Sequence, residues 1–272
     1  MTEILRYTAF TTDPAGGNPA GVVLDATGLD DAAMQAITAE LGYSETAFVT
    51  GKYAVRYFSP RAEVPFCGHA TVATAVALAE RIGPGELVFS TQAGEVPVSV
   101  DEELRATLTS VEPYVEEVTD VSQVLDILGW RADQLDPALP PAIAYAGARH
   151  LVLSTSTRQR LADLEYDFDR LLAYMLERDL TTLQLVWRES ATTFHVRDPF
   201  PVGGVVEDPA TGAAAAAFGA YLRELGAVDA PVTLTLHQGH DLGRPSLIRV
   251  ELRAEDTRVR VSGHAVPITE PG

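Results

Sequence analysis

The chain has 272 residues and a formal net charge of -18, and 46% of its residues are hydrophobic. Such an acidic chain disfavours nucleic acid as a partner, since phosphate binding needs clustered lysine and arginine, and the apolar content excludes a disordered chain. One cysteine cannot form an internal disulfide, no apolar run reaches the ~18 residues of a membrane span, and the opening residues do not resemble a signal peptide. We therefore expect a cytoplasmic globular protein with a small-molecule partner and no membrane contact.

In chain order, the first half predicts short strands with two helices between them. A turn-rich segment occupies residues 13–19, and a helix is predicted to begin at Asp30 and to end at Leu41, where Gly42 suits a C-terminal cap. The expected strands are residues 4–10, 20–24, 46–49, 53–58, 86–90 and 95–100.

The next helix is predicted to be buried. Residues 70–81 read ATVATAVALAER and are apolar almost all the way round, which is typical of a helix that packs on every side. The segment 111–120, rich in Glu and Val, is the expected crossover to the second half.

The chain also repeats itself at an offset close to 140 residues. Gly68–Thr71 can be placed over Asp208–Thr211, and a long Ala-rich helix follows each, the second over residues 212–224. In this alignment Glu207 is the counterpart of Cys67. The flanking segments that also match are 53–58 with 193–197 and 92–94 with 237–239.

The repeat predicts an α+β fold of two pseudo-symmetric halves, each a set of short strands wrapped around one Ala-rich helix. We expect an N-terminal domain of residues 1–112, joined by a C-terminal strand 260–272, and a C-terminal domain of residues 113–259. The N-termini of the two helices can then face each other across a cleft. Their unpaired N–H groups and partial positive charge would bind a carboxylate without any arginine.

Two residues near these helix starts have both a structural and a chemical interpretation. Asp208 precedes Pro209, a pair typical of a helix N-cap followed by the first helical position, so Asp208 is either a cap or a catalytic group facing His69. His69 either caps its own helix or exchanges a proton near neutral pH.

Glu45 lies where the first helix gives way to a strand. By alternation it shares a face with Ala47 and Val49. If that face is internal, the carboxyl is partly desolvated and can both take and return a proton; the alternative is an exposed glutamate at a strand start.

Cys67 precedes the buried helix, where the helix dipole would stabilise a thiolate. A single cysteine cannot form a two-thiol pair, so a buried, inert cysteine is the other interpretation. Nucleotide-binding glycine loops, paired Cys/His metal spacings and a nucleophile elbow are absent from the sequence. His237 and His240 flank Gly239, which argues against a metal site there.

Several short motifs follow one another over nearly the whole chain. They are GNPAGVVL at 17–24, SETAFV at 44–49, FCGHAT at 66–71, EDPATG at 207–212, and QG at 238–239 followed by GRPS at 243–246. Together they resemble the phenazine-biosynthesis PhzF-like isomerases, part of the diaminopimelate epimerase-like superfamily.

The resemblance implies two β-rolls, each around a central helix, a cofactor-independent proton shuttle without a metal, and a homodimer. The acid–base glutamate of the family falls on Glu45, its histidine on His69 and its aspartate on Asp208. Backbone N–H groups would hold a substrate carboxylate at the two helix starts. The expected substrate-binding residues are Asn18, Ser44, Gly68, Ala70, Thr211, Gly212, Ala213 and Gln238.

Two positions depart from the family pattern. Ala213 stands where many members have Ser, which removes a hydroxyl contact but keeps the backbone donor. Cys67 stands where the phenazine enzymes have a small apolar residue and many relatives have a cysteine. The substrate therefore need not be a phenazine precursor.

The expected activity is isomerisation of a small carboxylate, in which Glu45 removes a proton from one carbon and returns it to another. Two alternatives stay open. One is a racemase or epimerase that uses Cys67, with Asp208 or Glu207 as second base. The other is a non-catalytic small-molecule-binding protein, in which Asp208 is only a helix cap.

Overall fold

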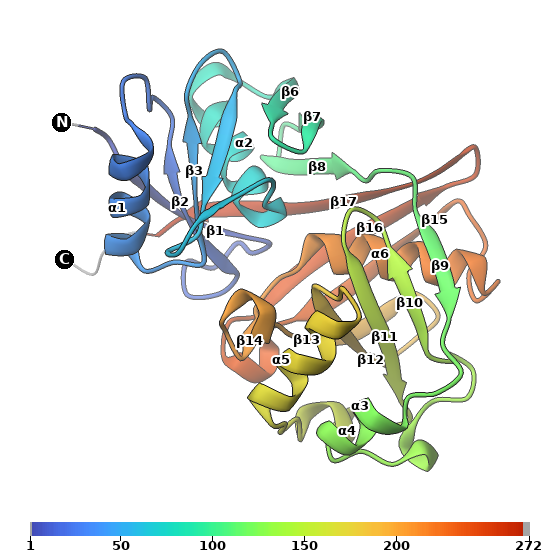
Figure 1. Cartoon of the computed structure of the whole chain (residues 1–272). Coiled ribbons are helices and arrows are strands. Elements are labelled where there is room, and N and C mark those ends of the chain that lie inside the picture. Colours follow the sequence, from blue (N-terminus) through green and yellow to red (C-terminus); the bar gives the residue numbers. More distant parts are fainter. Residues whose placement is uncertain (1, 269–272) are drawn as a thin grey trace. The chain divides into compact units, whose positions relative to one another are not determined.

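The structure, a computed structural model, describes residues 2–268. Contacts within the chain divide it into two compact units, which we call the N-terminal unit (Met1–Thr109 with Ser262–Gly272) and the C-terminal unit (Ser110–Val261). The domain boundaries expected from the sequence, 1–112 with 260–272 and 113–259, remain a prediction. The end of the expected strand 260–272, from residue 269 onward, lies outside the described residues. Figure 1 follows the elements of each unit along the chain by colour.

The N-terminal unit pairs its first strands in a fixed order. β1 is antiparallel to β2, β2 is parallel to β3, β3 is antiparallel to β4, and β4 is antiparallel to β5. The later strands β6, β7 and β8 form an antiparallel meander, and the end of β17 pairs with β1. The elements are β1 (Leu5–Ala9), β2 (Asn18–Val23), α1 (Asp31–Leu41), β3 (Glu45–Val49), β4 (Val55–Phe58), β5 (Glu63–Val64), α2 (Gly68–Ile82), β6 (Gly85–Thr91), β7 (Gly94–Val100), β8 (Arg105–Thr109) and, from Ser262 onward, β17 (Asp256–Pro267), whose first residues belong to the C-terminal unit.

The C-terminal unit repeats that order. β10 is antiparallel to β11, β11 is parallel to β12, β12 is antiparallel to β13, and β13 is antiparallel to β14. The elements are β9 (Tyr114–Glu117), α3 (Ser122–Ile127), η1 (Ala132–Gln134), β10 (Ala142–Tyr145), β11 (Arg149–Thr155), α4 (Arg158–Ala162), α5 (Phe168–Glu177), β12 (Thr182–Arg188), β13 (Thr193–Pro199), η2 (Pro201–Gly203), β14 (Glu207–Asp208), α6 (Gly212–Glu224), β15 (Val232–Gln238), η3 (His240–Leu242) and β16 (Ser246–Arg253).

The duplication therefore extends to strand order and direction, but its alignment differs from the one drawn from the sequence. Gly68 and Gly212 are the first residues of α2 and α6 and lie 144 residues apart. The counterpart of Cys67 is thus Thr211 rather than Glu207, and the counterpart of Asp208 is Val64. The sequence alignment was wrong by four residues because Asp208-Pro209 looks like a helix start, whereas Asp208 ends a short strand and the helix begins later.

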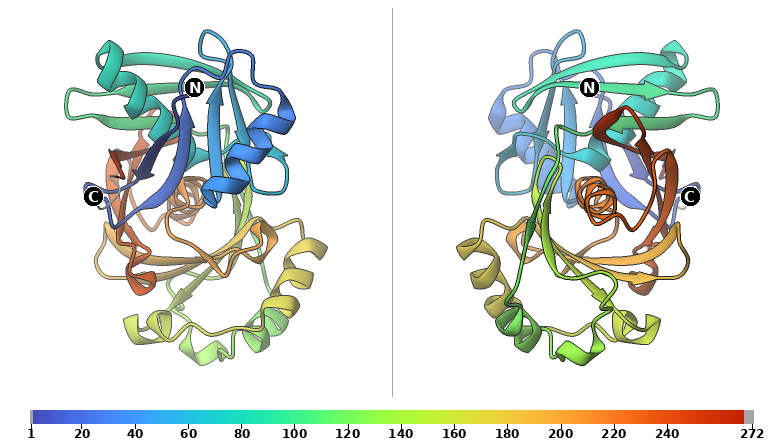
Figure 2. Two further views of the ribbon diagram at one scale, coloured as in Figure 1. Left: turned by 90° about the vertical axis from the view of Figure 1, so that its left-hand side faces the viewer. Right: turned by 90° about the vertical axis from the view of Figure 1, so that its right-hand side faces the viewer.

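Each unit is organised around its Ala-rich helix, as the sequence predicts. α2 contacts β1, β2, β3, β7 and β8, and α6 contacts β9, β10, β11, β12 and β16. Figure 2 shows α6 nearly end-on among the strands of its own unit. Alanines make both helices narrow, so strands pack closely on several sides and nearly all residues of the first three turns are buried.

The other sheet faces carry the remaining helices. Met34 of α1 packs with Val23, Phe48 and Phe58 in the N-terminal unit. In the C-terminal unit α3, α4 and α5 cover a larger apolar cluster that includes Leu153, Leu171, Met175, Leu183 and Leu185. Helices thus cover both faces of the strands in each unit. This packing holds in place the strand ends at which the predicted site residues lie.

Most element ends follow local rules. Asp30 caps α1 by accepting a hydrogen bond from the Ala33 N–H, and Gly42 ends the helix with a φ of 69°, as expected. The predicted turn at 13–19 was too long, since Asn18 and Pro19 already belong to β2. Pro19 is tolerated because it pairs only with Thr8 of β1, beyond the point where β3 joins.

The expected crossover at 111–120 contains a strand, β9, which pairs with β10. Tyr114 of β9 stacks on Tyr145 of β10, with ring centroids 4.6 Å apart, and this contact explains why the segment is extended. Within residues 2–268, the helices are all too short or too polar to span a bilayer.

Candidate active site

Glu45 is the first residue of β3, and its side chain is only 15% exposed. Its backbone lies opposite Ala20 of β2 in the parallel register. The carboxylate Oε2 lies 3.5 Å from Nε2 of His69. The interpretation of Glu45 as an exposed glutamate at a strand start is therefore wrong, and the carboxyl is directed inward toward the start of α2.

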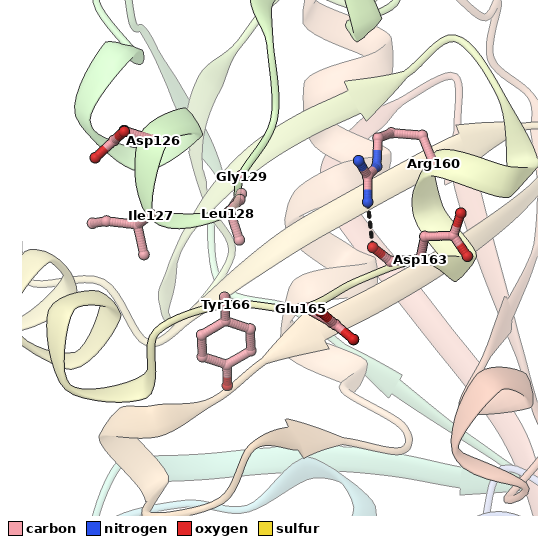
Figure 3. Close-up of a pocket in the computed structure, with 8 residues that line it drawn as sticks. All are labelled: Asp126, Ile127, Leu128, Gly129, Arg160, Asp163, Glu165 and Tyr166. Carbon is pink, nitrogen blue, oxygen red and sulfur yellow. Dashed lines mark hydrogen bonds between the residues drawn. The ribbon is translucent and has the colours of Figure 1, made fainter.

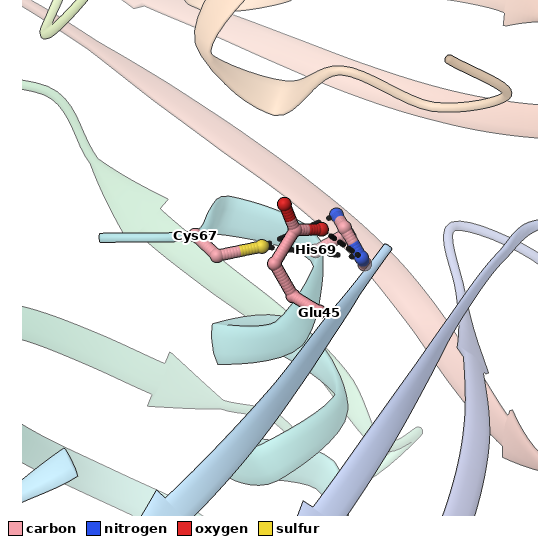
Figure 4. A group of neighbouring side chains, drawn as sticks. All are labelled: Glu45, Cys67 and His69. Atoms are coloured by element: carbon pink, nitrogen blue, oxygen red, sulfur yellow. Dashed lines mark hydrogen bonds and ion pairs between the residues drawn. The ribbon is translucent and has the colours of Figure 1, made fainter. Parts of the chain in front are cut away.

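Three reactive side chains meet at this helix start, as Figure 4 shows. Cys67 is the N-cap residue of α2 and is buried, and its Sγ lies 3.4 Å from Nδ1 of His69. Ser44 Oγ lies 3.4 Å from Nε2 of the same ring. His69 is the second residue of α2 and is 6% exposed, so it is inside the helix rather than capping it. A carboxylate, an imidazole, a thiol and a hydroxyl are thereby brought together by two elements.

The other predicted residues of the N-terminal unit lie near these elements. Ala70 follows His69 in the first turn of α2 and is fully buried, whereas a Cβ on Gly68 would meet only Phe66 at 4.0 Å. The backbone around Gly68 is therefore approachable. Asn18 begins β2, opposite Ala9, and is 1% exposed.

A second group of predicted residues gathers at the start of α6, within the C-terminal unit. Thr211 donates its hydroxyl proton to Oδ2 of Asp208 over 2.6 Å, and its N–H donates to Oε1 of Gln238 over 2.9 Å. Gln238 Nε2 donates to the Asp208 carbonyl at 2.8 Å and to the Thr211 hydroxyl at 3.0 Å. This network fixes the orientation of the Asp208 carboxylate.

Asp208 is consequently not a helix cap. It lies in β14, four residues before α6, and the N-cap residue is Thr211. Gly239, which follows Gln238, has a φ of 72°, and a Cβ there would lie 2.7 Å from the Pro209 carbonyl oxygen. A glycine is required at this position for β15 to end against the loop that follows Asp208.

Neither Ala-rich helix is capped by a side chain. No side-chain cap hydrogen bond is made by Cys67 at α2 or by Thr211 at α6, whereas Asp30 and Asp167 cap α1 and α5 in the usual way. The first turns of α2 and α6 contain the predicted carboxylate-binding residues Gly68, Gly212 and Ala213. An N-terminus without a side-chain acceptor has backbone donors for an external anion.

Sequence reasoning missed a buried carboxyl beside Asp208. Asp198 of β13 lies opposite Asp208 in the antiparallel register and is fully buried. Oriented with its nitrogen toward the carboxyl, the Gln184 amide donates to Oδ1 of Asp198 at 2.7 Å and to Oδ2 at 3.1 Å. Burial raises the pKa of Asp198 well above its usual range, and the nearby Asp208 and Glu207 carboxylates raise it further.

An ion pair adjoins this carboxyl. Arg197 donates through Nε and Nη2 to Glu207, with Nη2–Oε2 at 2.5 Å, and both side chains are buried. Burial raises the pKa of Glu207, while Arg197 opposes that shift. The repeat could have revealed this ion pair. Arg56 and Glu63 occupy the equivalent positions on β4 and β5 and also form an ion pair, at 2.6 Å.

A cavity of about 460 Å³ lies elsewhere in the C-terminal unit (Figure 3). Arg160 there donates to the carbonyl of Asp163. None of the residues predicted for the site lines this cavity, and its side chains do not converge on a common point in Figure 3. Its lining residues are Asp126, Ile127, Leu128, Gly129, Arg160, Asp163, Glu165 and Tyr166.

Two similar units, each with strands around an Ala-rich helix and reactive groups at the start of that helix, define the class of diaminopimelate epimerase-like folds. A probable proline racemase from Agrobacterium radiobacter shares the fold, with a TM-score of 0.67 at 11% identity over 98% of this chain and 91% of that one.

The family described as phenazine biosynthesis-like protein matches residues 7–271, and the chain belongs to this family, which confirms the resemblance drawn from the sequence motifs. An uncharacterized isomerase of Mesorhizobium japonicum is 34% identical over 98% of this chain and 96% of its own. The trans-2,3-dihydro-3-hydroxyanthranilate isomerase of Pseudomonas fluorescens is 31% identical over 98% and 97%. A crystal structure of a PhzF family protein from Bacillus anthracis has a TM-score of 0.88 at 26% identity, over 98% and 97%.

These relatives also decide the general class of activity. The chain is an isomerase of this family, so the sequence-based alternative of a non-catalytic binding protein is not retained. The roles of individual residues and the substrate belong to the proposal that follows.

Proposed function

We propose that the protein is a cofactor-independent isomerase that moves a proton within a small unsaturated carboxylate substrate, with Glu45 as the acid–base residue. The observation that carries the proposal is the inward-facing Glu45 carboxylate, 15% exposed and 3.5 Å from Nε2 of His69. A carboxylate held in a partly desolvated position can remove a proton from an activated carbon and return it to another. No external cofactor enters this reaction.

His69 and Asp208 are proposed to assist the transfer. His69 lies within reach of both Glu45 and Ser44, so it can stabilise the charged form of the base. Asp208 is oriented by Thr211, which suits a group that contacts a substrate in one geometry. That both groups act on one substrate molecule is supported by the family, whose motifs include both.

The first turns of α2 and α6 are proposed to hold the substrate carboxylate. Their backbone N–H groups at Gly68, Gly212 and Ala213 supply hydrogen bonds and the positive end of a helix dipole. Ala213 brings no hydroxyl, so the backbone is the donor at that position. The remaining predicted substrate contacts are Asn18, Ser44, Ala70, Thr211 and Gln238.

The first substrate to test is trans-2,3-dihydro-3-hydroxyanthranilate, because a relative 31% identical to this chain is named as its isomerase. Turnover of this compound and of other small unsaturated or 2-amino acids is measured by proton NMR. Glu45→Gln is expected to lose about 10²–10⁴-fold in kcat, with Glu45→Asp losing less because it keeps a carboxylate. A folded Glu45→Gln variant with near-complete turnover would contradict the assignment.

An epimerase that uses Cys67 is the second candidate, favoured by the 3.4 Å contact between its Sγ and Nδ1 of His69. Under this alternative Cys67→Ala abolishes turnover, and solvent deuterium enters at a stereocentre without movement of a double bond. The Glu45 shuttle predicts that Cys67→Ala keeps measurable isomerisation.

The assembly is proposed to be a homodimer, as the family resemblance implies. Light scattering coupled to size-exclusion chromatography tests this directly. A mass near 29.1 kDa would mean a monomer and contradict the proposal.

A further inference from the structure

We propose that Glu45, Cys67 and His69 form a three-ligand site for a divalent transition metal ion such as Zn²⁺, and that the metal regulates the enzyme by inhibition. One ligand-type atom from each residue can be chosen so that all three atoms lie within 4.8 Å of one another. The sequence predicted no metal because the paired Cys/His spacings of zinc motifs are absent. Here the ligands come instead from two separate elements, the start of β3 and the start of α2.

The distances match a tetrahedral ion. A Zn²⁺ ion bound by sulfur, nitrogen and oxygen at its usual bond lengths separates these ligand atoms by about 3.3–3.6 Å. In the structure Nε2 of His69 lies 3.5 Å from Oε2 of Glu45 and 3.9 Å from Sγ of Cys67. Sγ also lies 3.4 Å from Nδ1 of His69, so the imidazole ring must rotate to direct the Nε2 lone pair at an ion shared with Cys67 and Glu45.

The chemistry of the donors also selects a metal of this type. Thiolate and imidazole ligands favour Zn²⁺ and Co²⁺ over Mg²⁺ and Ca²⁺, which prefer oxygen alone. Three protein ligands leave the fourth tetrahedral position to water or another small ligand. Binding requires the thiolate of Cys67, so the thiol proton is released to solvent as the metal–sulfur bond forms.

The histidine cluster of the C-terminal unit is a useful contrast. His195 and His237 stack face to face, with ring centroids 5.0 Å apart and an interplanar angle of 30°. Stacked rings present their π faces, not their nitrogen lone pairs, to each other. His195 is additionally paired with Glu189 at 3.0 Å. His240 completes this cluster, but among the described residues its side chains do not form a close three-ligand group, so the cluster serves as the control for nonspecific binding.

The inhibitory part of the proposal rests on the proposed function of Glu45. A bound ion occupies the Glu45 carboxylate and a lone pair of His69, so neither can take part in proton transfer. Removal of the ion by a chelator restores both groups. Metal binding itself does not depend on that function and is measured without substrate.

The binding test is a titration of the metal-free protein with Co²⁺, followed by absorption spectroscopy in a buffer with a non-thiol reductant. Cys67 is the only cysteine of the chain, so a near-ultraviolet sulfur-to-cobalt charge-transfer band reports on this site alone. We expect one Co²⁺ per chain, intense visible bands of a tetrahedral ion, and displacement by an equivalent of Zn²⁺, which binds more tightly.

The variants make the result specific. Cys67→Ser is expected to lose the charge-transfer band, and Glu45→Gln and His69→Gln to weaken Co²⁺ binding at least tenfold. His195→Gln is expected to bind as the unmodified chain does. Far-ultraviolet circular dichroism and melting temperatures establish that each variant is folded. Absence of the band at millimolar Co²⁺, or an unchanged affinity in folded Glu45→Gln and His69→Gln, would overturn the metal site.

Turnover separates this proposal from the proposed function. With both correct, one equivalent of Zn²⁺ inhibits the unmodified chain and a chelator reverses the inhibition. A Co²⁺ band with full turnover in the metal-bound protein would overturn the regulatory role and count against Glu45 as the base. If the unmodified chain shows no Co²⁺ band and Glu45→Gln still loses turnover, only the metal site is overturned and the proposed function stands.

Discussion

The starts of α2 and α6 share one architecture and differ in chemistry. In each unit a two-residue strand precedes the helix by the same spacing, and the helix has no side-chain cap. The N-terminal unit has Val64, Cys67 and His69 where the C-terminal unit has Asp208, Thr211 and Ala213. The fold therefore places backbone donors at the same position twice, while side chains give one helix start an imidazole and a thiol and the other a network around a carboxylate.

The strands beside these helices differ in the same way. Tyr57 of β4 lies opposite Val64 and hydrogen-bonds Thr71 at 2.7 Å, whereas the equivalent Asp198 lies opposite Asp208. One unit buries neutral hydroxyl groups where the other buries two carboxyls. The contrast indicates that the C-terminal unit accepts an electrostatic cost that the fold itself does not require, which is typical of a functional site.

The largest effect on stability is expected at the two equivalent ion pairs. Arg197→Met leaves the buried Glu207 carboxyl without its partner, and should lower the free energy of unfolding by about 3–5 kcal/mol. The side chain of Glu63 is already 21% exposed, so water can solvate it when Arg56 is lost. Arg56→Met should therefore lower the free energy of unfolding by about 1 kcal/mol or less. Urea denaturation of both variants measures the difference, and equal losses would show that burial does not distinguish the pairs.

Asp198→Asn tests the buried carboxyl through pH. Because the folded-state pKa of Asp198 is raised, its contribution to stability is present at low pH and is lost as pH rises above the unfolded pKa of about 3.9. The stability of Asp198→Asn relative to the unmodified chain should therefore increase from pH 4 to pH 8, by at most about 1.4 kcal/mol per pH unit. Urea curves at several pH values measure this, with the exposed Glu102→Gln as control. A difference independent of pH would contradict the raised pKa.

A smaller effect is expected at Thr182, which begins β12 as Glu45 begins β3. Its hydroxyl pairs with Nδ1 of His150 at 2.7 Å, and burial lowers the pKa of that histidine to about 3. Thr182→Val should cost about 1–2 kcal/mol of stability, because the buried ring loses its partner. Turnover should stay unchanged, since a strand start without a carboxylate takes no part in proton transfer. A loss of kcat would contradict this separation of roles.

His150 also predicts an acid sensitivity. A depressed folded-state pKa means that its contribution to stability is present above the unfolded pKa of about 6.5 and is lost as pH falls toward 3. His150→Leu combined with Thr182→Val should flatten the pH dependence of unfolding between pH 6.5 and 4 by up to one bound proton. An unchanged slope would show that His150 is not the group responsible.

Local sequence patterns predicted the helices and strands well, but they predicted the alignment of the two repeated halves poorly. Asp30 with Gly42, and the Ala-rich runs, identify helices because capping and periodicity are local properties. The repeat was displaced by four residues because Asp208-Pro209 looks like a helix start. Asp198 was missed because only the register between β13 and β14 brings it opposite Asp208. The connection between these two strands is longer than the one between β4 and β5, so the repeat did not reveal the pairing. The shared Arg–Glu pairs were the available sign of the correct alignment.

Of the candidate site, the sequence motifs supplied the residues, and the structure supplied their grouping. Cys67 and His69 are close in sequence, but the contact of His69 with Glu45 joins residues 24 positions apart and depends on how β3 and α2 pack. The substrate is not determined by these groups, because helix N-termini and a carboxylate accept many small acids. Family membership therefore carries the choice of the first substrate to test.

The central claim is that Glu45 carries a proton between two carbons, and deuterium transfer tests it most directly. The unmodified chain, Glu45→Gln and the matched Thr182→Val are incubated in D₂O with a substrate that turns over, and proton NMR follows both isomerisation and deuterium uptake. The account predicts isomerisation by the unmodified chain and by Thr182→Val, with deuterium in the product to the extent that the Glu45 carboxyl exchanges its proton with solvent before returning it, and neither isomerisation nor uptake above about 1% of that rate in folded Glu45→Gln. Equal isomerisation and deuterium uptake in all three proteins would contradict it.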